Sequence, residues 1–170
     1  MLAPARRVAL LDRYAAGPRR LLAAFEDVPD AARQWRPAPD AWSAHEIVVH
    51  CGDSETTSAS RIRYLLAERE VQIVGYDQDR WATTFDYHAL PLAPCFAAIE
   101  AVRAMTAPLL AGLADAAWER AGRHSESGRY GVEDWLLIYA EHLELHARQL
   151  EANVAAWHAA QHTTAAPARG

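Results

Sequence analysis

Two histidines stand four residues apart in a long helical pattern near the C-terminal end of the chain. His142 and His146 share one helix face, because residues four apart are neighbours on a helix surface. They fall within the apolar stripe of Trp135, Leu145 and Leu150, where a helix that faces a core normally carries leucines. Imidazole is the side chain that most often binds transition metals. The pair therefore predicts half of a metal site, which needs a further ligand from another element.

A third histidine occupies the inward stripe of an earlier helical segment. His50 comes three residues after Ile47 and four before Ser54, so all three lie along one face. Three histidines leave coordination positions open for water or substrate, as in catalytic rather than structural sites. Neutral imidazole suits Zn, Ni, Fe or Cu, and the sequence does not choose among them. The alternative is that these are core histidines with hydrogen-bonded ring nitrogens and no metal.

Two carboxylates lie near His50 on its helix face. Asp53 follows it by three residues and Glu46 precedes it by four, so either could orient a ligand or accept a proton. We take Asp53 as the candidate base or orienting group, with a solvated surface charge as the alternative. Glu144 stands midway between the two later histidines and points about 200° away from His142, so a zincin-type protease site is not expected.

A second pair of histidines has the same spacing but a different direction. His158 lies sixteen residues after His142, which turns it about 160° around the helix. His162 follows four residues later, close to the chain end. We expect both to be exposed and to take no part in the site.

Four helical segments must position these residues, and together they predict an all-α fold, a four-helix bundle with long crossover connections. Ser43 and Glu46 form a capping box at the start of the second segment, and Gly17-Pro18 interrupts the first. We expect one domain over residues 1–162, a disordered tail over residues 163–170 and no clear strand. The expected helices are residues 5–26, 44–69, 94–113 and 132–158, joined by irregular segments at 70–91 and 118–130.

Composition limits the classes of partner. A formal net charge of −5 gives no electrostatic reason to expect nucleic acid or an anionic membrane as a partner. We expect no membrane helix, because no apolar run approaches the roughly 18 residues that one needs. The N-terminus lacks the apolar region of a signal peptide. Cys51 and Cys95 are too few for a disulfide framework, so a reducing, cytoplasmic location is expected.

The order of these motifs resembles the DinB-like (YfiT-like) superfamily of metal-dependent helical bundles. The resemblance rests on Trp35-Arg36-Pro37-Ala38-Pro39-Asp40-Ala41-Trp42-Ser43, on Glu46-Ile47-Val48-Val49-His50 with Asp53-Ser54-Glu55, and on His142-x-x-x-His146 with Gln149-Leu150. It implies a four-helix bundle in which His50, His142 and His146 bind a divalent metal, most often Zn or Ni. It also implies a homodimer and relatives that include transferases and isomerases dependent on low-molecular-weight thiols.

The sequence thus predicts an enzyme in which the three-histidine metal activates a thiol or water, for transfer to or hydrolysis of a small-molecule substrate. A low-molecular-weight thiol would be the cosubstrate in the transfer reaction. The alternative is a non-catalytic, metal-binding or stress-linked bundle in which the metal mainly stabilises the fold.

Overall fold

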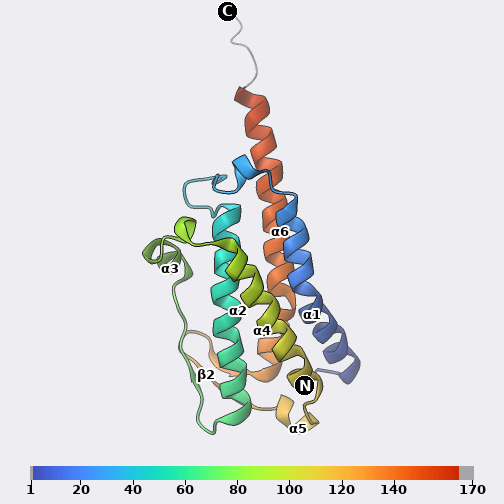
Figure 1. Cartoon of the computed structure of the whole chain (residues 1–170). Coiled ribbons are helices and arrows are strands. Elements are labelled where there is room, and N and C mark those ends of the chain that lie inside the picture. The colour runs from blue at the N-terminus through green and yellow to red at the C-terminus, as the bar shows by residue number, and fades with distance from the viewer. Residues whose placement is uncertain (1, 165–170) are drawn as a thin grey trace, which may run out of the picture.

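The four long helices pack into a bundle, as predicted (Figure 1). The structure is a computed structural model that describes residues 2–164. The long helices are α1 (Pro4–Glu26), α2 (Ala44–Ala67), α4 (Leu92–Ala111) and α6 (Val132–Thr164). The shorter elements are η1 (Asp30–Ala32), β1 (Gln72–Ile73), α3 (Gln78–Thr84), η2 (Tyr87–Ala89), α5 (Asp115–Trp118), β2 (Ala121–His124) and β3 (Gly128–Gly131).

The first two long helices, α1 and α2, are not neighbours in the bundle although they follow one another in the chain. Helix α1 packs against α4 and α6, and α2 packs against the same two helices, so α1 and α2 occupy opposite corners. Helices α2 and α4 run in the same direction (Figure 1), and residues 68–91 therefore carry the chain back along the bundle. The long crossover connections predicted from the sequence are confirmed.

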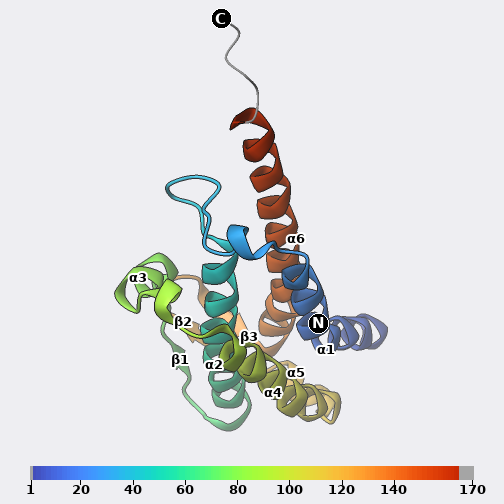
Figure 2. The same ribbon diagram turned by 45° about the horizontal axis from the view of Figure 1, so that its top comes forward.

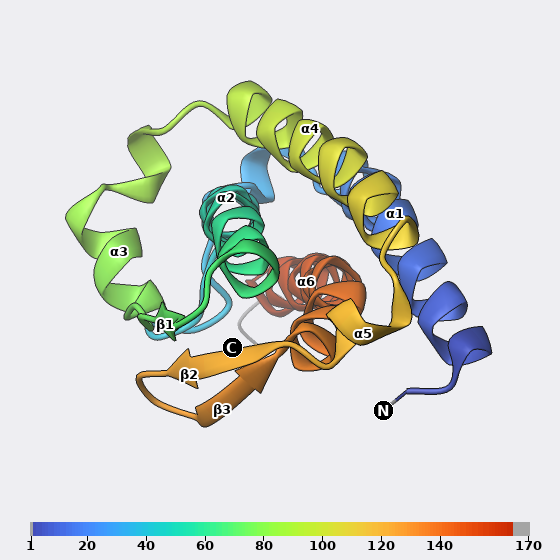
Figure 3. The same cartoon turned by 90° about the horizontal axis from the view of Figure 1, so that it is seen from below.

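Both connections contain short strands that the sequence did not reveal. Strands β1 and β2 pair in parallel with Gln72 opposite Arg123, and β2 and β3 pair antiparallel with Ala121 opposite Gly131. Strands of two to four residues are too short for an alternating pattern to be recognised. Figure 3 shows this sheet and α3 on the side of α2 and α6 that faces away from α1 and α4. The connections thereby cover one face of the helix pair that carries the histidines.

Gly17-Pro18 does not break α1, which continues through both residues. Proline has no N–H to donate to the carbonyl four residues earlier, here that of Tyr14. The Nη1 atom of Arg103 from α4 donates to that carbonyl at 2.5 Å instead. A Cβ atom at position 17 would overlap the same guanidinium. The two residues thus create the place where Arg103 docks.

The predicted capping box fixes the start of α2. Ser43 Oγ accepts the Glu46 N–H at 3.2 Å, and Glu46 Oε2 accepts the Ser43 N–H at 2.9 Å. Arg36 forms an ion pair with Glu46, and His88 Nε2 lies 2.8 Å from Ser43 Oγ. Burial alone would raise the pKa of Glu46, but Arg36 and Ser43 hold it below its usual value. The N-terminal end of α2, which carries His50 in its second turn, is therefore firmly held.

Three details of the sequence analysis need correction. Helix α4 has the length and the mean hydropathy, 1.2, of a membrane span, which we did not predict for any segment. Its inner face packs on α1 and α2, and Arg103 is buried there. Leu145, which the sequence placed in the inward stripe, is 53% exposed. Helix α6 extends beyond the other helices (Figure 2) and includes residues 163–164 of the expected tail, whose remainder lies outside the described residues.

Candidate metal centre

The fold brings the three predicted histidines together. His50 comes from α2 and is 3% exposed, while His142 and His146 come from successive turns of α6 and are half-buried. The ring centroid of His50 lies 5.6 Å from that of His142 and 4.9 Å from that of His146. The centroids of His142 and His146 are 4.6 Å apart. One nitrogen from each ring lies within 4.8 Å of the others. Over residues 2–164 this is the one group of three or more potential metal-binding side chains.

Burial keeps two of these imidazoles neutral near pH 7. It lowers the pKa of His50 to about 2, with a further contribution from the neighbouring His146 and His142. It lowers the pKa of His146 to about 4, again helped by His142. Metal binding requires a deprotonated ring nitrogen, so these two rings are already in the required state.

Unsatisfied nitrogens at the centre fit a bound cation. The Nδ1 atom of His50 is buried and has no hydrogen-bond partner among the described residues. The Nδ1 atom of His142 has none either, but it lies 3.6 Å from a carboxylate oxygen of Glu55. His146 Nδ1 lies 2.9 Å from Gln149 Oε1, which accepts its proton and leaves Nε2 as a lone-pair donor. Buried polar atoms without partners are rare in proteins. Three imidazoles within reach of one another are a donor set suited to Zn or Ni.

A buried ion pair lies directly behind His142. Glu55 Oε1 is 3.6 Å from His142 Nδ1, and Glu55 accepts two hydrogen bonds from Arg103, at 2.6 and 3.0 Å. Both charged side chains are almost completely buried. Burial favours the neutral acid, but His142 and Arg103 together lower the pKa of Glu55. The carboxylate therefore favours a proton on Nδ1 of His142, which leaves the lone pair on Nε2.

Arg103 is held by the backbone of two helices. Its guanidinium donates to the carbonyls of Tyr14 in α1 and Tyr139 in α6. Neither Arg103 nor Glu55 was predicted from the sequence to be part of the site. The available signal was Arg103 itself, the one arginine within Leu92–Ala111, because a charge on the inner face of a helix needs a partner.

The other predicted site residue takes a different place. Asp53 Oδ2 accepts the hydroxyl proton of Tyr87 at 2.5 Å, which ties α2 to η2. Its role as a base or orienting group stays a prediction, and Glu55 is the carboxylate that lies beside a histidine of the group. Glu144 forms surface ion pairs with Arg13 and Arg148, pointing away as expected. His158 and His162 are exposed, also as expected.

Two open pockets flank the histidines, and Gln78 lines both. The first, here the Arg61 pocket, has a volume of about 220 Å³. It is lined by His50, Ser54, Arg61, Gly75, Tyr76, Gln78, His124, Glu126, Ile138, Tyr139 and His142. The second, here the Asp79 pocket, has a volume of about 210 Å³. It is lined by Asp40, Ala41, Trp42, Gln78, Asp79, His146 and Gln149.

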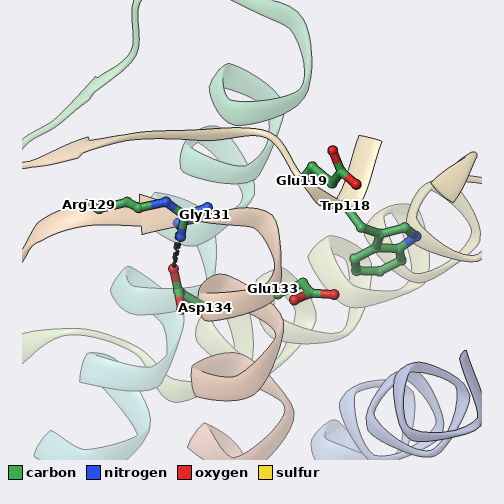
Figure 4. Close-up of a pocket in the computed structure, with 6 residues that line it drawn as sticks. All are labelled: Trp118, Glu119, Arg129, Gly131, Glu133 and Asp134. Atoms are coloured by element: carbon green, nitrogen blue, oxygen red, sulfur yellow. Dashed lines mark hydrogen bonds and ion pairs between the residues drawn. The ribbon is translucent and has the colours of Figure 1, made fainter. Parts of the chain in front are cut away.

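A larger cavity, of about 410 Å³, lies away from this centre at the N-terminal end of α6 (Figure 4). Arg129 and Asp134 pair across it, and none of the three histidines lines it. Cavity size alone would select this place, but the potential metal ligands are grouped elsewhere.

Comparison with known proteins agrees with this geometry. The sequence model of the DinB superfamily matches residues 13–150, a span that includes all three histidines. The chain belongs to the DinB superfamily. Among solved structures, this DinB protein resembles YfiT from Bacillus subtilis, described as "a probable metal-dependent hydrolase with an unusual four-helix bundle topology". The TM-score is 0.82 at 19% identity, over 90% of this chain and 88% of YfiT, which establishes the shared fold.

Two curated relatives of this DinB protein carry the name "Putative metal-dependent hydrolase". The protein from Oceanobacillus iheyensis is 30% identical over 105 residues, which are 62% of this chain and 60% of the relative. The protein from Geobacillus thermodenitrificans is 26% identical over 110 residues, 58% of this chain and 62% of the relative. The matched region thus spans about three fifths of the length of these relatives.

Proposed function

We propose that this DinB protein is a metal-dependent hydrolase acting on a small molecule, with His50, His142 and His146 as the ligands of a divalent metal. The observation that carries the proposal is the set of three imidazoles with nitrogens within 4.8 Å of one another, beside two open pockets. The names of its curated relatives support hydrolysis as the reaction. Zn and Ni are the metals that we expect.

The protein residues around the histidines would hold the ligands in the required state. Gln149 keeps the proton of His146 on Nδ1, and Glu55 attracts a proton to Nδ1 of His142. When bound, a divalent metal supplies a Lewis acid that lowers the pKa of water and polarises a carbonyl. Ser54 lies 3.4 Å from His142 Nε2 and offers a hydroxyl to a substrate in the Arg61 pocket.

A second candidate reaction is transfer to a low-molecular-weight thiol in place of water. The two pockets favour it, because one is lined by His146, the other by His50 and His142, and both by Gln78, so that each could hold one reactant. In that reaction the thiol would occupy one pocket and the electrophilic substrate the other. The non-catalytic alternative, in which the metal only stabilises the bundle, needs neither pocket.

Metal content and activity of the purified protein test the proposal together. The metal should be present at one equivalent per chain, be removed by a chelator and return with Zn or Ni. Ester and amide hydrolysis should follow the metal, and addition of thiols distinguishes hydrolysis from transfer. A protein that binds metal but is inactive with and without added thiols would support the non-catalytic alternative. A protein without stoichiometric metal would contradict hydrolysis, thiol transfer and the non-catalytic metal-binding alternative together.

Histidine variants give this test a matched control. His142→Ala should abolish stoichiometric metal binding, whereas His158→Ala, on the exposed part of the same helix, should not change it. If the two variants bind metal alike, the three-histidine assignment is wrong.

A further inference from the structure

Arg61 is a half-buried cation in the pocket next to the metal centre. Its Nη2 atom donates to the carbonyl of Val74 at 2.7 Å, and its guanidinium stacks over the Tyr76 ring at 5.6 Å. Within residues 2–164 it forms no ion pair with a carboxylate within 4 Å. A guanidinium has five N–H donors; the Val74 carbonyl accepts one, and the Tyr139 hydroxyl is a second acceptor beside it. Partly buried charges are usually paired, so this one has the capacity to bind an anion.

The residues around Arg61 supply further donors. The Glu126 N–H donates to His124 Nδ1 at 3.2 Å, so in the neutral ring the proton of His124 is on Nε2. Tyr76, Tyr139 and Ser54 add hydroxyl groups to the same lining. Glu126 is the one acidic side chain of this lining, and it is exposed.

The second pocket beside the histidines is more acidic than the Arg61 pocket. Asp40 and Asp79 line the Asp79 pocket, which contains no arginine. Carboxylates repel an anion and a guanidinium attracts one, so the charged end of an anionic substrate would be directed to the Arg61 side.

From these contacts we infer that Arg61 binds the carboxylate group of the substrate, and that the substrates of this protein are small carboxylate-bearing molecules. The planar guanidinium fork matches the two oxygens of a carboxylate. The inference rests on the proposed function, because it identifies the Arg61 pocket as the substrate pocket.

The helix geometry limits the length of such a substrate. Arg61 comes eleven residues after His50, which places it about 20° away on the same face of α2 and about 16 Å along the axis. Helical side chains lean toward the N-terminus of their helix, and the reach of an arginine in that direction would shorten this separation. The reacting bond would therefore lie several bonds away from the carboxylate rather than next to it.

Binding of sodium benzoate to the chelator-treated protein tests the inference. Without metal, a carboxylate cannot bind by coordination to the centre, so the test is independent of the proposed hydrolase activity. Benzoate should bind the wild-type protein more tightly than the neutral benzamide. Arg61→Gln should weaken benzoate binding at least about tenfold, which is about 1.4 kcal/mol. Arg61→Lys should have an intermediate effect, because it keeps the charge and loses the fork.

Arg123→Gln is the matched control, because it removes the same charge from the exposed residue next to His124. It should leave benzoate binding unchanged. Arg61 also donates to the Val74 carbonyl, so its replacement could change the shape of the pocket. Amide chemical shifts of the wild-type protein give a second readout that needs no variant. Benzoate should perturb the amides of Ser54, Gly75 and Tyr76. Equal binding of benzamide, unchanged binding to Arg61→Gln, or shift changes confined to another part of the surface would overturn the inference.

Discussion

At the scale of single residues, the metal centre depends on side chains that do not themselves bind metal. Glu55 and Arg103 form a buried pair whose carboxylate lies 3.6 Å from His142. Buried ion pairs are weak evidence for stability, because desolvation of both charges offsets their attraction. Because Glu55 lies beside His142, the pair has a second role besides stability, which is to fix the position of the proton on the His142 ring.

Glu55→Gln should separate these two roles. The variant leaves the Arg103 charge buried without its partner, which should cost about 3–5 kcal/mol of unfolding free energy. It should also lower metal affinity by about 10–100-fold. Urea unfolding measures the first effect and competition with a chromogenic chelator measures the second.

The double variant Glu55→Gln/Arg103→Met is the control for this experiment. It removes the unpaired charge, so it should be more stable than the single variant, while metal affinity should stay low. Recovery of metal affinity together with stability would mean that Glu55 acts only through the fold.

The pH dependence of stability reports the buried histidines of the metal-free protein. Their folded-state pKa values, about 2 for His50 and about 4 for His146, lie below the usual value of 6.5. The unfolded chain therefore takes up protons below pH 6.5 that the folded chain does not. Stability should be constant above pH 6.5 and fall by up to about 1.4 kcal/mol per pH unit for each histidine below it.

Urea unfolding of the chelator-treated protein between pH 7.5 and 4.5 measures this slope. His146→Gln should reduce it, since one of the two groups is lost. An equal slope in this variant would show that other groups cause the acid sensitivity.

At the scale of elements, the bundle helices are shaped around Arg103. Pro18 leaves the Tyr14 carbonyl without a helical donor, and Gly17 leaves space beside it. The guanidinium of Arg103 from α4 fills this space and donates to the carbonyl. The same guanidinium reaches α2 through Glu55 and α6 through the Tyr139 carbonyl. One side chain thus connects all four long helices next to the metal centre.

Gly17→Ala should destabilise the protein although alanine is the better helix former. A methyl group at this position overlaps the Arg103 guanidinium, and overpacking of this kind costs about 1–3 kcal/mol. Gly112→Ala, at the end of α4 where a Cβ atom meets nothing closer than 3.6 Å, is the control and should cost less. Thermal unfolding compares the two, and equal stabilities would show that the contact at Gly17 yields without cost.

At the scale of the whole molecule, a metal at this centre would connect α2 with α6. These helices come from opposite halves of the chain and are joined through two long connections. A ligand that binds only the folded state stabilises it by mass action, by about 4 kcal/mol at a thousand times its Kd. The homodimer implied by the resemblance stays a prediction, which light scattering of the purified protein would check.

Removal of the metal should therefore lower the melting temperature. For a chain of this size about 1 kcal/mol corresponds to about 2–4 °C, so chelation should lower it by about 8–16 °C at high metal saturation. Differential scanning fluorimetry with and without chelator measures the change. The His142→Ala variant should melt at the same temperature in both conditions, and a chelator effect that persists in it would place the metal elsewhere.

The sequence by itself determined the four helices, the capping box and the inward faces that carry His50, His142 and His146, because these depend on local spacing within one helix. Tertiary structure alone decided that Glu55 and Arg103 lie behind His142 and that Asp53 is turned to Tyr87. It also decided that Arg61 and His124 share a pocket with the metal centre. Such contacts join segments far apart in the chain, and the angle between helices that fixes them leaves no periodic signal in the sequence.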